Sequence, residues 1–425
     1  MFTIEYTTDK DFELRSKRPA AKTDDIIPVV KHVLDAVKNN GDTAIRELTM
    51  KFDNSCPDNF LVTPQEIADA EQEVSDDLKK AILIAKANIE KFHKSQIIND
   101  ITKVSTTDGI ECWQKMVPIE KVGIYIPGGS APLFSTVLML GIPARLAGCK
   151  EIVLCSPPRS GGNINPVVLY CANLLGITKI FKIGGSQAIA AMAYGTESVP
   201  KVSKIFGPGN RFVTVAKQLV NSSETAIDMP AGPSELAVVA DCSTNAVYAA
   251  ADLLSQCEHG TDSQVGLFVC DEDKKNEIIA EAERQLKLLP RREIAEKAFA
   301  LSFAVVTENN QQSVQLSNLW APEHLIISTD DALNLAELVS NAGSVFIGHY
   351  ACESAGDYAS GTNHTLPTNG AAKAYSGLNM DSFTKKITFQ TISEKGIKTI
   401  GHAIEIMAAA EQLDAHKNAV TVRLG

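Results

Sequence analysis

Short runs of β-branched and other apolar residues, alternating with helical segments, constrain the fold of this chain more than any other feature. The runs begin at Val122 and end at Ile347. Strands that alternate with helices of about 10–15 residues are typical of parallel sheets with helices on both faces, so we expect an α/β fold. The expected strands are VGIYI (122–126), EIVLC (151–155), KIFKI (179–183), VSKIF (202–206), ELAVVA (235–240), VGLFV (265–269), FAVV (303–306), HLIIS (324–328) and SVFI (344–347).

Helical periodicity precedes these runs and returns at the end of the chain. Residues 25–95 contain two amphipathic stretches, the second from about Pro64 to His93. The stretch after Gly377 has few strand signals and ends in a helix that is apolar along one side. We therefore expect an N-terminal arm (1–20), a discontinuous α/β domain carrying most of the site (21–124 with 236–378), an inserted domain (125–235) and a C-terminal tail (379–425).

Length and charge exclude several classes of protein. A chain of 425 residues exceeds one ordinary core, so at least two domains are expected. The net charge of −11 offers no basic field for nucleic acid or an anionic membrane, and no apolar run is long enough to span a bilayer. The N-terminal residues lack the pattern of a secretory signal, and the nine scattered cysteines form no CxxC pair. These features predict buried thiols and a cytoplasmic location.

Three glycine-rich turns follow strand-like runs and precede helical segments. A glycine turn that opens a helix presents free backbone N–H groups, which suit a pyrophosphate, so dinucleotide binding is one interpretation. The alternative is that these glycines only make tight turns, because no turn is a complete GxGxxG with an acidic residue about twenty positions later. The turns are PGGSAPLFST (127–136), GGSQAIAAMA (184–193) and GPGNRFVTVA (207–216).

Histidines beside carboxylates or amides form the second candidate cluster. Gln256 and His259 are spaced i,i+3 on one expected helix, although a solvated histidine at a helix end is the simpler interpretation. The other pairs are Glu323 with His324, Asp357 with His364, and Glu411 with His416. The pattern suggests a metal or acid/base site, but spacing alone does not show that the segments meet.

Taken together, seven segments resemble the histidinol dehydrogenase family over nearly the whole chain. The segments are VGIYIPGGSAPLFSTVLM, FGPGNRFVT, DMPAGPSE, LLSQCEHGTDSQV, APEHLII, ESAGDYASGTNH and AAAEQLDAHKNAVTVR. The resemblance implies two Rossmann-like domains, the inserted one binding NAD, in a homodimer with a C-terminal dimerisation tail. It also implies oxidation of L-histidinol to L-histidine through a bound aldehyde, with two NAD⁺ and one zinc ion, as the last step of histidine biosynthesis.

The resemblance also assigns roles to residues of this chain. It implies that His324 and Glu323 form the acid/base pair, with His324 deprotonating the alcohol and Glu323 activating water. The implied zinc ligands are Gln256, His259, Asp357 and His416, and the implied NAD contacts are Tyr125, Gln187 and Asn210. The implied substrate contacts are Ser234, Gln256, His259, His324, Asp357, His364, Glu411 and His416, the last two entering the partner's site.

Three alternatives stay open from the sequence. A relative with the same zinc and NAD chemistry could oxidise another small diol or amino alcohol. An aldehyde dehydrogenase could use a cysteine nucleophile, although nothing places Cys112, Cys149 or Cys155 beside a cation at a helix N-terminus. A non-enzymatic metal-binding or scaffold protein could use the α/β units only for packing.

Overall fold

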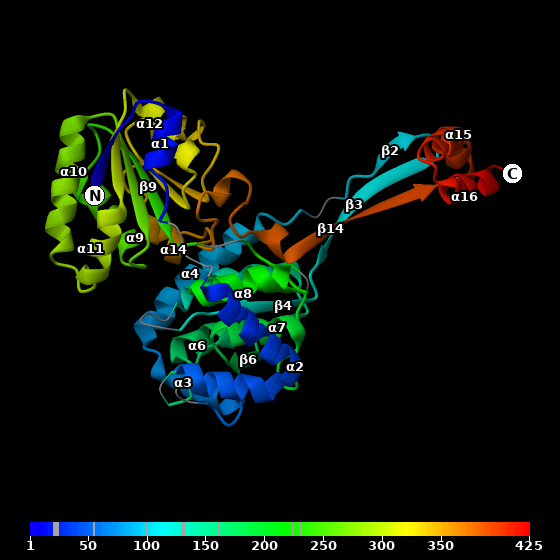
Figure 1. Cartoon of the computed structure of the whole chain (residues 1–425), viewed down its shortest axis with the longest axis horizontal. Helices are drawn as coiled ribbons and strands as arrows, with labels where there is room; N and C mark the ends of the chain where they lie inside the picture. Colours follow the sequence, from blue (N-terminus) through cyan, green and yellow to red (C-terminus); the bar gives the residue numbers. More distant parts are fainter. Residues whose placement is uncertain are drawn as a thin grey trace.

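The described residues form two parallel sheets and an antiparallel ribbon, which confirms the expected α/β class (Figure 1). Among these residues, no helix combines the length and apolar character needed to cross a bilayer. The computed structural model describes residues 1–19, 25–53, 56–98, 101–128, 133–159, 161–222, 224–229 and 232–425.

The first parallel sheet has six strands. Alternate side chains of each strand point to opposite faces, so Leu236 and Val238 pack on one side while Ala237 and Val239 pack on the other. Both faces are apolar because helices cover both. The strand order is β1 (Phe2–Glu5), β11 (Phe303–Val306), β10 (Gln264–Val269), β9 (Glu235–Ala240), β12 (His324–Ser328) and β13 (Ser344–Ile347). The helices are α9 (Ala246–Cys257), α10 (Glu272–Leu286) and α11 (Arg292–Leu301) on one face, and α1 (Asp9–Arg15), α12 (Asn310–Trp320) and α13 (Ala332–Ala336) on the other.

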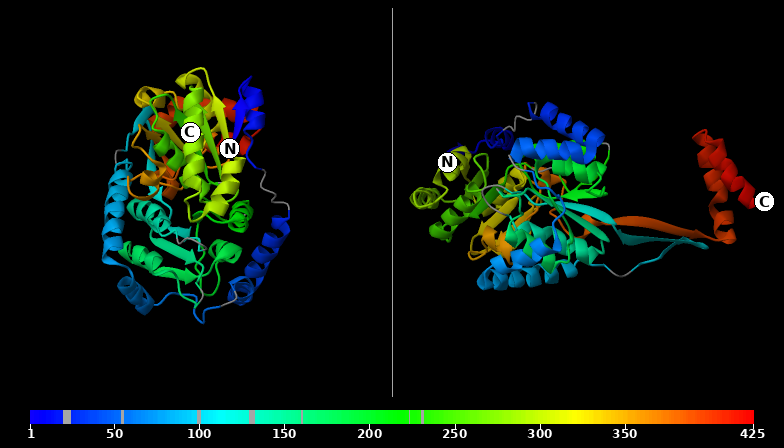
Figure 2. Two further views of the ribbon diagram at one scale, coloured as in Figure 1. Left: turned by 90° about the vertical axis from the view of Figure 1, so that its left-hand side faces the viewer. Right: turned by 90° about the horizontal axis from the view of Figure 1, so that it is seen from below.

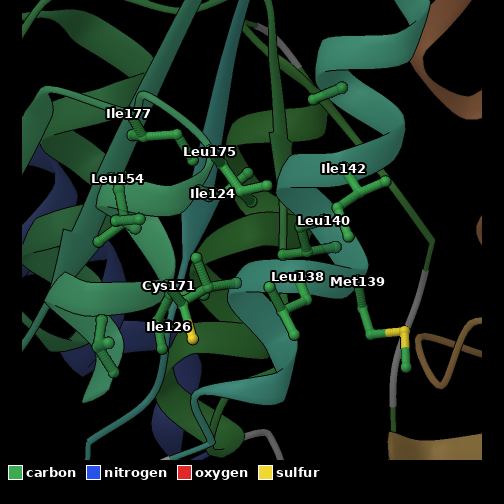
Figure 3. Packing of buried hydrophobic residues seen from close by; sticks show 14 of the residues in the cluster. Ile124, Ile126, Leu138, Met139, Leu140, Ile142, Leu154, Cys171, Leu175 and Ile177 are labelled. Carbon is green, nitrogen blue, oxygen red and sulfur yellow. The ribbon is translucent and has the colours of Figure 1, made fainter. Parts of the chain in front are cut away.

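The second parallel sheet has five strands and is also covered by helices on both faces. Its central strand contributes Ile124 to an apolar core (Figure 3). The same core contains Leu138 and Leu140 of the helix Ser135–Ala147, and Leu175, which directly follows the helix Pro166–Leu174. The strand order is β6 (Lys179–Lys182), β5 (Glu151–Ser156), β4 (Lys121–Tyr125), β7 (Lys204–Phe206) and β8 (Ala226–Ile227). The helices are α3 (Pro64–Glu73), α4 (Asp76–Lys94), α5 (Ser135–Ala147) and α6 (Pro166–Leu174) on one face, and α2 (Ile26–Asp53), α7 (Gly185–Tyr194) and α8 (Arg211–Asn221) on the other.

The N-terminal helices pack differently from the expected grouping with residues 236–378. Helices α2 and α4 lie on opposite sides of the five-stranded sheet, as the blue and light-blue helices of Figure 2 show. The apolar side of α2, including Val33 and Val37, shares a core with α7, which explains this choice of sheet. The expected single stretch 64–93 is two helices, because Ser75 caps α4 by accepting from the backbone N–H of Leu78. The N-terminal arm is also not separate from the domains, since β1 pairs with β11.

A long arm projects from the molecule and ends in a helical hairpin (Figures 1 and 2). Strand β14 (Thr384–Ile392) pairs antiparallel with β3 (Ile110–Pro118), which also pairs with β2 (Val104–Thr107). Helices α15 (Glu394–Ala410) and α16 (Asp414–Leu424) follow β14. The expectation of a tail with few strands was therefore wrong for β14, whose period-2 pattern is weak because most of its side chains are exposed. Short helices η1 (Ala371–Lys373), η2 (Met380–Phe383) and α14 (Glu353–Tyr358) lie between β13 and this arm.

Candidate active site

The expected acid/base pair lies at the amino edge of the six-stranded sheet, where β12 begins. His324 is the first residue of β12 and pairs with Leu236, which follows Glu235, the first residue of β9. The backbone N–H of Glu235 donates to Oε2 of Glu323 (3.0 Å), and the backbone carbonyl of Glu235 lies 3.2 Å from Nδ1 of His324. Glu323 and His324 are only 6% and 4% exposed, so a single backbone residue orients two buried side chains.

Three carboxylates surround the imidazole of His324. Its Nε2 lies 3.4 Å from Oδ1 of Asp357, and its Nδ1 lies 3.7 Å from Oε2 of Glu323 and 3.9 Å from Oε1 of Glu353. Burial opposes the charged imidazole, but the three carboxylates outweigh it and raise the pKa of His324 to about 10. Burial raises the pKa of both Glu323 and Glu353 to about 8. These groups therefore share protons as one cluster.

The same cluster offers ligand atoms for a metal ion. Atoms of His259, Glu353 and Asp357 lie within 4.8 Å of one another. The side-chain amide of Gln256, oriented to satisfy its neighbours, donates to Oε2 of Glu353 (3.1 Å) and accepts from the backbone N–H of Glu235 (3.1 Å). Among the described residues, Oδ1 of Asp357 is buried and makes no hydrogen bond apart from its ion-pair approach to Nε2 of His324 (3.4 Å), which suits a ligand atom for a cation. Imidazole nitrogen with carboxylate oxygen is a donor set that suits zinc.

Glu353 is the functional candidate that the sequence analysis missed. It accepts from Oγ of Ser255 (3.3 Å) and faces both Gln256 and His324. Glu353 and Asp357 are four residues apart on α14, and i,i+4 residues share a helix face. The i,i+4 spacing of the two carboxylates is the sequence signal that could have identified Glu353, whereas the sequence analysis paired Asp357 with His364.

His364 connects the acidic cluster to the second sheet. Its Nε2 lies 3.2 Å from Oγ of Ser135, the first residue of α5, and its pKa is lowered chiefly by burial. The adjacent Asn363 donates to the backbone carbonyl of Met139 (2.7 Å) and approaches Nε2 of His93 (3.3 Å). His93 is therefore a buried packing residue. These bonds place the site between the amino edge of one sheet and the carboxyl edge of the other.

The expected NAD contacts lie at the carboxyl edge of the five-stranded sheet. Tyr125 ends β4 and accepts a hydrogen bond from the backbone N–H of Gly185 (3.1 Å), at the start of α7. Gln187 is buried in α7, and Asn210 caps α8 by accepting from the backbone N–H groups of Phe212 and Val213 (both 3.1 Å). The N-termini of α7 and α8 therefore lie at this edge, which is where parallel α/β sheets commonly bind phosphate groups. Residues 129–132 of the first glycine turn lie outside the described residues.

The close packing of the third glycine turn requires its first glycine. Gly207 has φ +124°, and an added Cβ would lie 2.2 Å from the backbone oxygen of Tyr125. Asp228 accepts from the backbone N–H of Gly207 (2.8 Å), and Lys217 donates to the carbonyl of the same residue (2.8 Å). The turn is therefore fixed by a buried ion pair between Lys217 and Asp228.

The remaining expected residues divide into two groups. Ser234 is partly buried and directly precedes Glu235, the residue whose backbone contacts Glu323 and His324. Glu411 and His416 are exposed in the helical hairpin, which Figure 1 shows at the far end of the arm from β9 and α14. Within one chain, the structure therefore does not bring these two residues to the cluster.

Cys149, Cys155 and Cys171 do not have the properties of a nucleophilic thiol. All nine cysteines are free thiols. Burial raises the pKa of Cys149 to about 11 and that of Cys171 to about 12, and it also raises the pKa of Cys155. A reactive cysteine needs a lowered pKa, so these three thiols are suited to packing.

Comparisons with known proteins agree over the whole length. A family model described as histidinol dehydrogenase matches residues 16–424. Histidinol dehydrogenase of Bacteroides thetaiotaomicron is 57% identical over 424 residues, covering 100% of this chain and 99% of the relative. Histidinol dehydrogenase of Campylobacter jejuni is 50% identical, covering 98% of this chain and 97% of the relative. The crystal structure of histidinol dehydrogenase from Elizabethkingia anophelis has a TM-score of 0.97 at 52% identity, covering 100% of this chain and 98% of that one.

Proposed function

The chain belongs to the histidinol dehydrogenase family and is an oxidoreductase, and we propose that it oxidises L-histidinol to L-histidine with NAD and zinc. The comparisons with known proteins confirm the family resemblance that the sequence motifs indicate. The proposed reaction removes four electrons through bound L-histidinaldehyde and is the final step of histidine biosynthesis. NAD chemistry and nine free thiols favour the reducing cytoplasm as its location.

The observation that carries the proposal is the buried pair Glu323 and His324 at the start of β12, next to the ligand atoms of Asp357 and His259. Alcohol oxidation requires removal of a proton from the hydroxyl, and oxidation of an aldehyde to an acid requires a water molecule that loses a proton. We assign the first proton to His324 and the second to Glu323. Their fixed orientation on the backbone of Glu235 makes them suitable for both steps.

Gln256, His259, Asp357 and His416 would hold zinc, of which the first three belong to the main body of the chain. When bound, zinc would fix the amine and imidazole nitrogens of the substrate and, by its charge, lower the pKa of His324. Glu353 then accepts the amide hydrogen of Gln256 and keeps that side chain in one orientation.

Tyr125, Gln187 and Asn210 would line the NAD site. When bound, NAD⁺ would accept the hydride. Ser234, His364 and Glu411 are the further proposed substrate contacts, together with the four proposed metal ligands and His324. Burial keeps His364 neutral, so its imidazole can donate and accept hydrogen bonds with a polar substrate.

Product stoichiometry tests the proposed function. We expect two NADH per histidinol consumed, because each hydride carries two electrons and the oxidation removes four. Little free aldehyde should appear, since a closed site suppresses side reactions of a reactive intermediate. The measurement is NADH absorbance together with chromatography of histidinol, histidinaldehyde and histidine. A ratio near one with accumulating aldehyde would reject the four-electron reaction.

The alternative substrate, another small diol or amino alcohol, is tested in the same assay. The neutral His364 beside Ser135 favours a substrate with an imidazole or similar group. If a simple amino alcohol without imidazole reacts as efficiently as histidinol, the family member has a different substrate.

We propose further that two chains form a homodimer in which the tail of each completes the site of the other. The support is the projecting arm, which carries Glu411 and His416 away from their own cluster, and the exposed apolar residues Ile406, Met407 and Val422 on its hairpin. Apolar side chains of this size that gather on a projecting element are usually covered by a partner.

Mixed dimers test the shared site. Co-expression of a His259→Ala chain with a His416→Ala chain should restore activity, because one site of a mixed dimer then carries both lesions and the other carries neither. Random pairing makes about half of the dimers mixed, so about a quarter of all sites in the co-expressed mixture should recover. After the mixed dimers are purified with two affinity tags, about half of their sites should turn over, because one of the two sites carries neither lesion.

The matched control combines His259→Ala with Asp357→Ala, two lesions of the main body that cannot complement by this route. If the first pair gives no more activity than either parent, although mixed dimers are present, each chain builds its own site.

A further inference from the structure

Arg18, in the segment after α1, lies at the centre of a buried polar network. Its Nη2 donates to Oε2 of Glu235 (2.8 Å) and to the backbone carbonyl of Trp320 (2.7 Å), and its Nε donates to the other carboxylate oxygen of Glu235. The guanidinium also lies over the indole ring of Trp320, 4.6 Å from the ring centroid. A bidentate bond to a carboxylate fixes both position and orientation, which a point charge would not do.

Glu235 connects Arg18 to the acid/base pair of Glu323 and His324. Its side chain is 3% exposed, and its Oε1 also accepts from the backbone N–H of Asn369 (2.8 Å). Its own backbone N–H and carbonyl contact Glu323 and His324. A shift of Glu235 would therefore move the backbone groups that orient both side chains.

The second route from Arg18 runs through the chain that precedes Glu323. Arg18 donates to the carbonyl of Ala321 (3.3 Å), and Ala321 has the left-handed φ of 54°. A left-handed alanine is strained, so it persists only where surrounding bonds hold it. Pro322 alone separates Ala321 from Glu323. Arg18 thus restrains Glu323 and His324 in two ways, through Glu235 and through the residues that directly precede Glu323.

We infer that Arg18 is a positioning residue for the oxidation, acting through Glu235 and the carbonyls of Trp320 and Ala321 to hold Glu323 and His324 in their reactive placement. This inference rests on the proposed function, because it takes the acid/base roles of the pair from there. A purely structural role for Arg18 is the competing explanation, and it would change stability without a specific effect on proton transfer.

The test is the Arg18→Ala variant, assayed for oxidation of supplied histidinaldehyde with NAD⁺. We expect kcat to fall by about 10²-fold, the loss typical of a misplacement of about 1 Å, while the KM values for aldehyde and NAD⁺ stay near those of the unmodified protein. Free guanidinium ion, at a concentration below the denaturing range, should restore part of kcat by occupying the vacated position. Sodium chloride at the same ionic strength should not.

Arg15→Ala is the matched control. Arg15 lies on α1 three residues earlier, and it donates to the exposed backbone carbonyl of Glu5 and pairs with Asp11 at 3.9 Å. Its replacement should leave kcat unchanged and give no response to guanidinium. A loss of kcat in Arg18→Ala that follows a drop in melting temperature and that guanidinium does not restore would overturn the inference.

A double variant separates this inference from the proposed function. If Arg18 acts through Glu323, adding Arg18→Ala to Glu323→Gln should cause a much smaller further loss than in the unmodified background. Multiplying losses would mean that Arg18 acts elsewhere, which rejects the inference alone. If Glu323→Gln by itself has no effect, the proposed acid/base assignment fails instead.

Arg18→Lys covers the case in which the alanine variant does not fold. Lysine keeps the charge but cannot bridge Glu235 and two carbonyls in one plane. A folded Arg18→Lys protein with reduced kcat and normal KM supports the positioning role, and one with full kcat overturns it.

Discussion

Replacing Glu323 by glutamine is expected to slow oxidation of supplied histidinaldehyde by about 10²–10⁴-fold, the usual contribution of a general base. Glutamine preserves the shape and can still accept from the backbone N–H of Glu235, but it cannot take a proton from water. Glu323 is suited to this task because burial raises its pKa to about 8, close to the working pH. NADH formation from the aldehyde and from histidinol, measured separately, gives the two half-reactions.

His324→Asn is the companion variant and should damage alcohol oxidation as well, since the proposed base of the first step is then missing. Glu337→Gln, at an exposed position after α13, is the control for a generic loss of a carboxylate. If Glu323→Gln and His324→Asn both lose less than about threefold in both half-reactions, the two residues are polar groups at a strand end and not the acid/base pair.

Removal of metal is expected to abolish turnover and leave the protein folded. The proposed ligands of the main body, Gln256, His259 and Asp357, lie near helix ends in a chain with large apolar cores, so the fold does not depend on the ion as that of a small zinc domain does. A chelator should strip the zinc, and added Zn²⁺ should restore activity. Elemental analysis measures the bound metal and circular dichroism measures the fold.

Single-residue variants connect that loss to the proposed ligands. His259→Ala should bind much less zinc, whereas His402→Ala, at an exposed position on α15, should bind as much as the unmodified protein. A metal-free protein with full turnover would reject the zinc assignment, and so would equal zinc content in the two variants.

Local pattern in the sequence was sufficient for the elements and for the family. Each expected strand run between residues 122 and 347 corresponds to a strand of the two parallel sheets, because a run buried on both faces must be apolar throughout. The long motifs identified the family. The pair of Glu323 and His324 was visible for the same reason, as two polar residues at the start of an apolar run.

Only the tertiary structure decided which elements meet. The sequence could not assign α2 and α4 to the five-stranded sheet, because an amphipathic face shows that a helix is buried but not against which partner. The contact between Glu353 and Gln256 exists only because α14 packs against α9. The bond between Arg18 and Glu235 likewise joins residues that are 217 positions apart in the sequence. The projecting arm is the clearest case. Its strand β14 has exposed side chains on both faces, so only the backbone pairing with β3 reveals it. The pattern of apolar residues in a sequence indicates which side chains are buried. Contacts between distant segments depend on the complementary shape and hydrogen bonding of surfaces that form only in the folded chain.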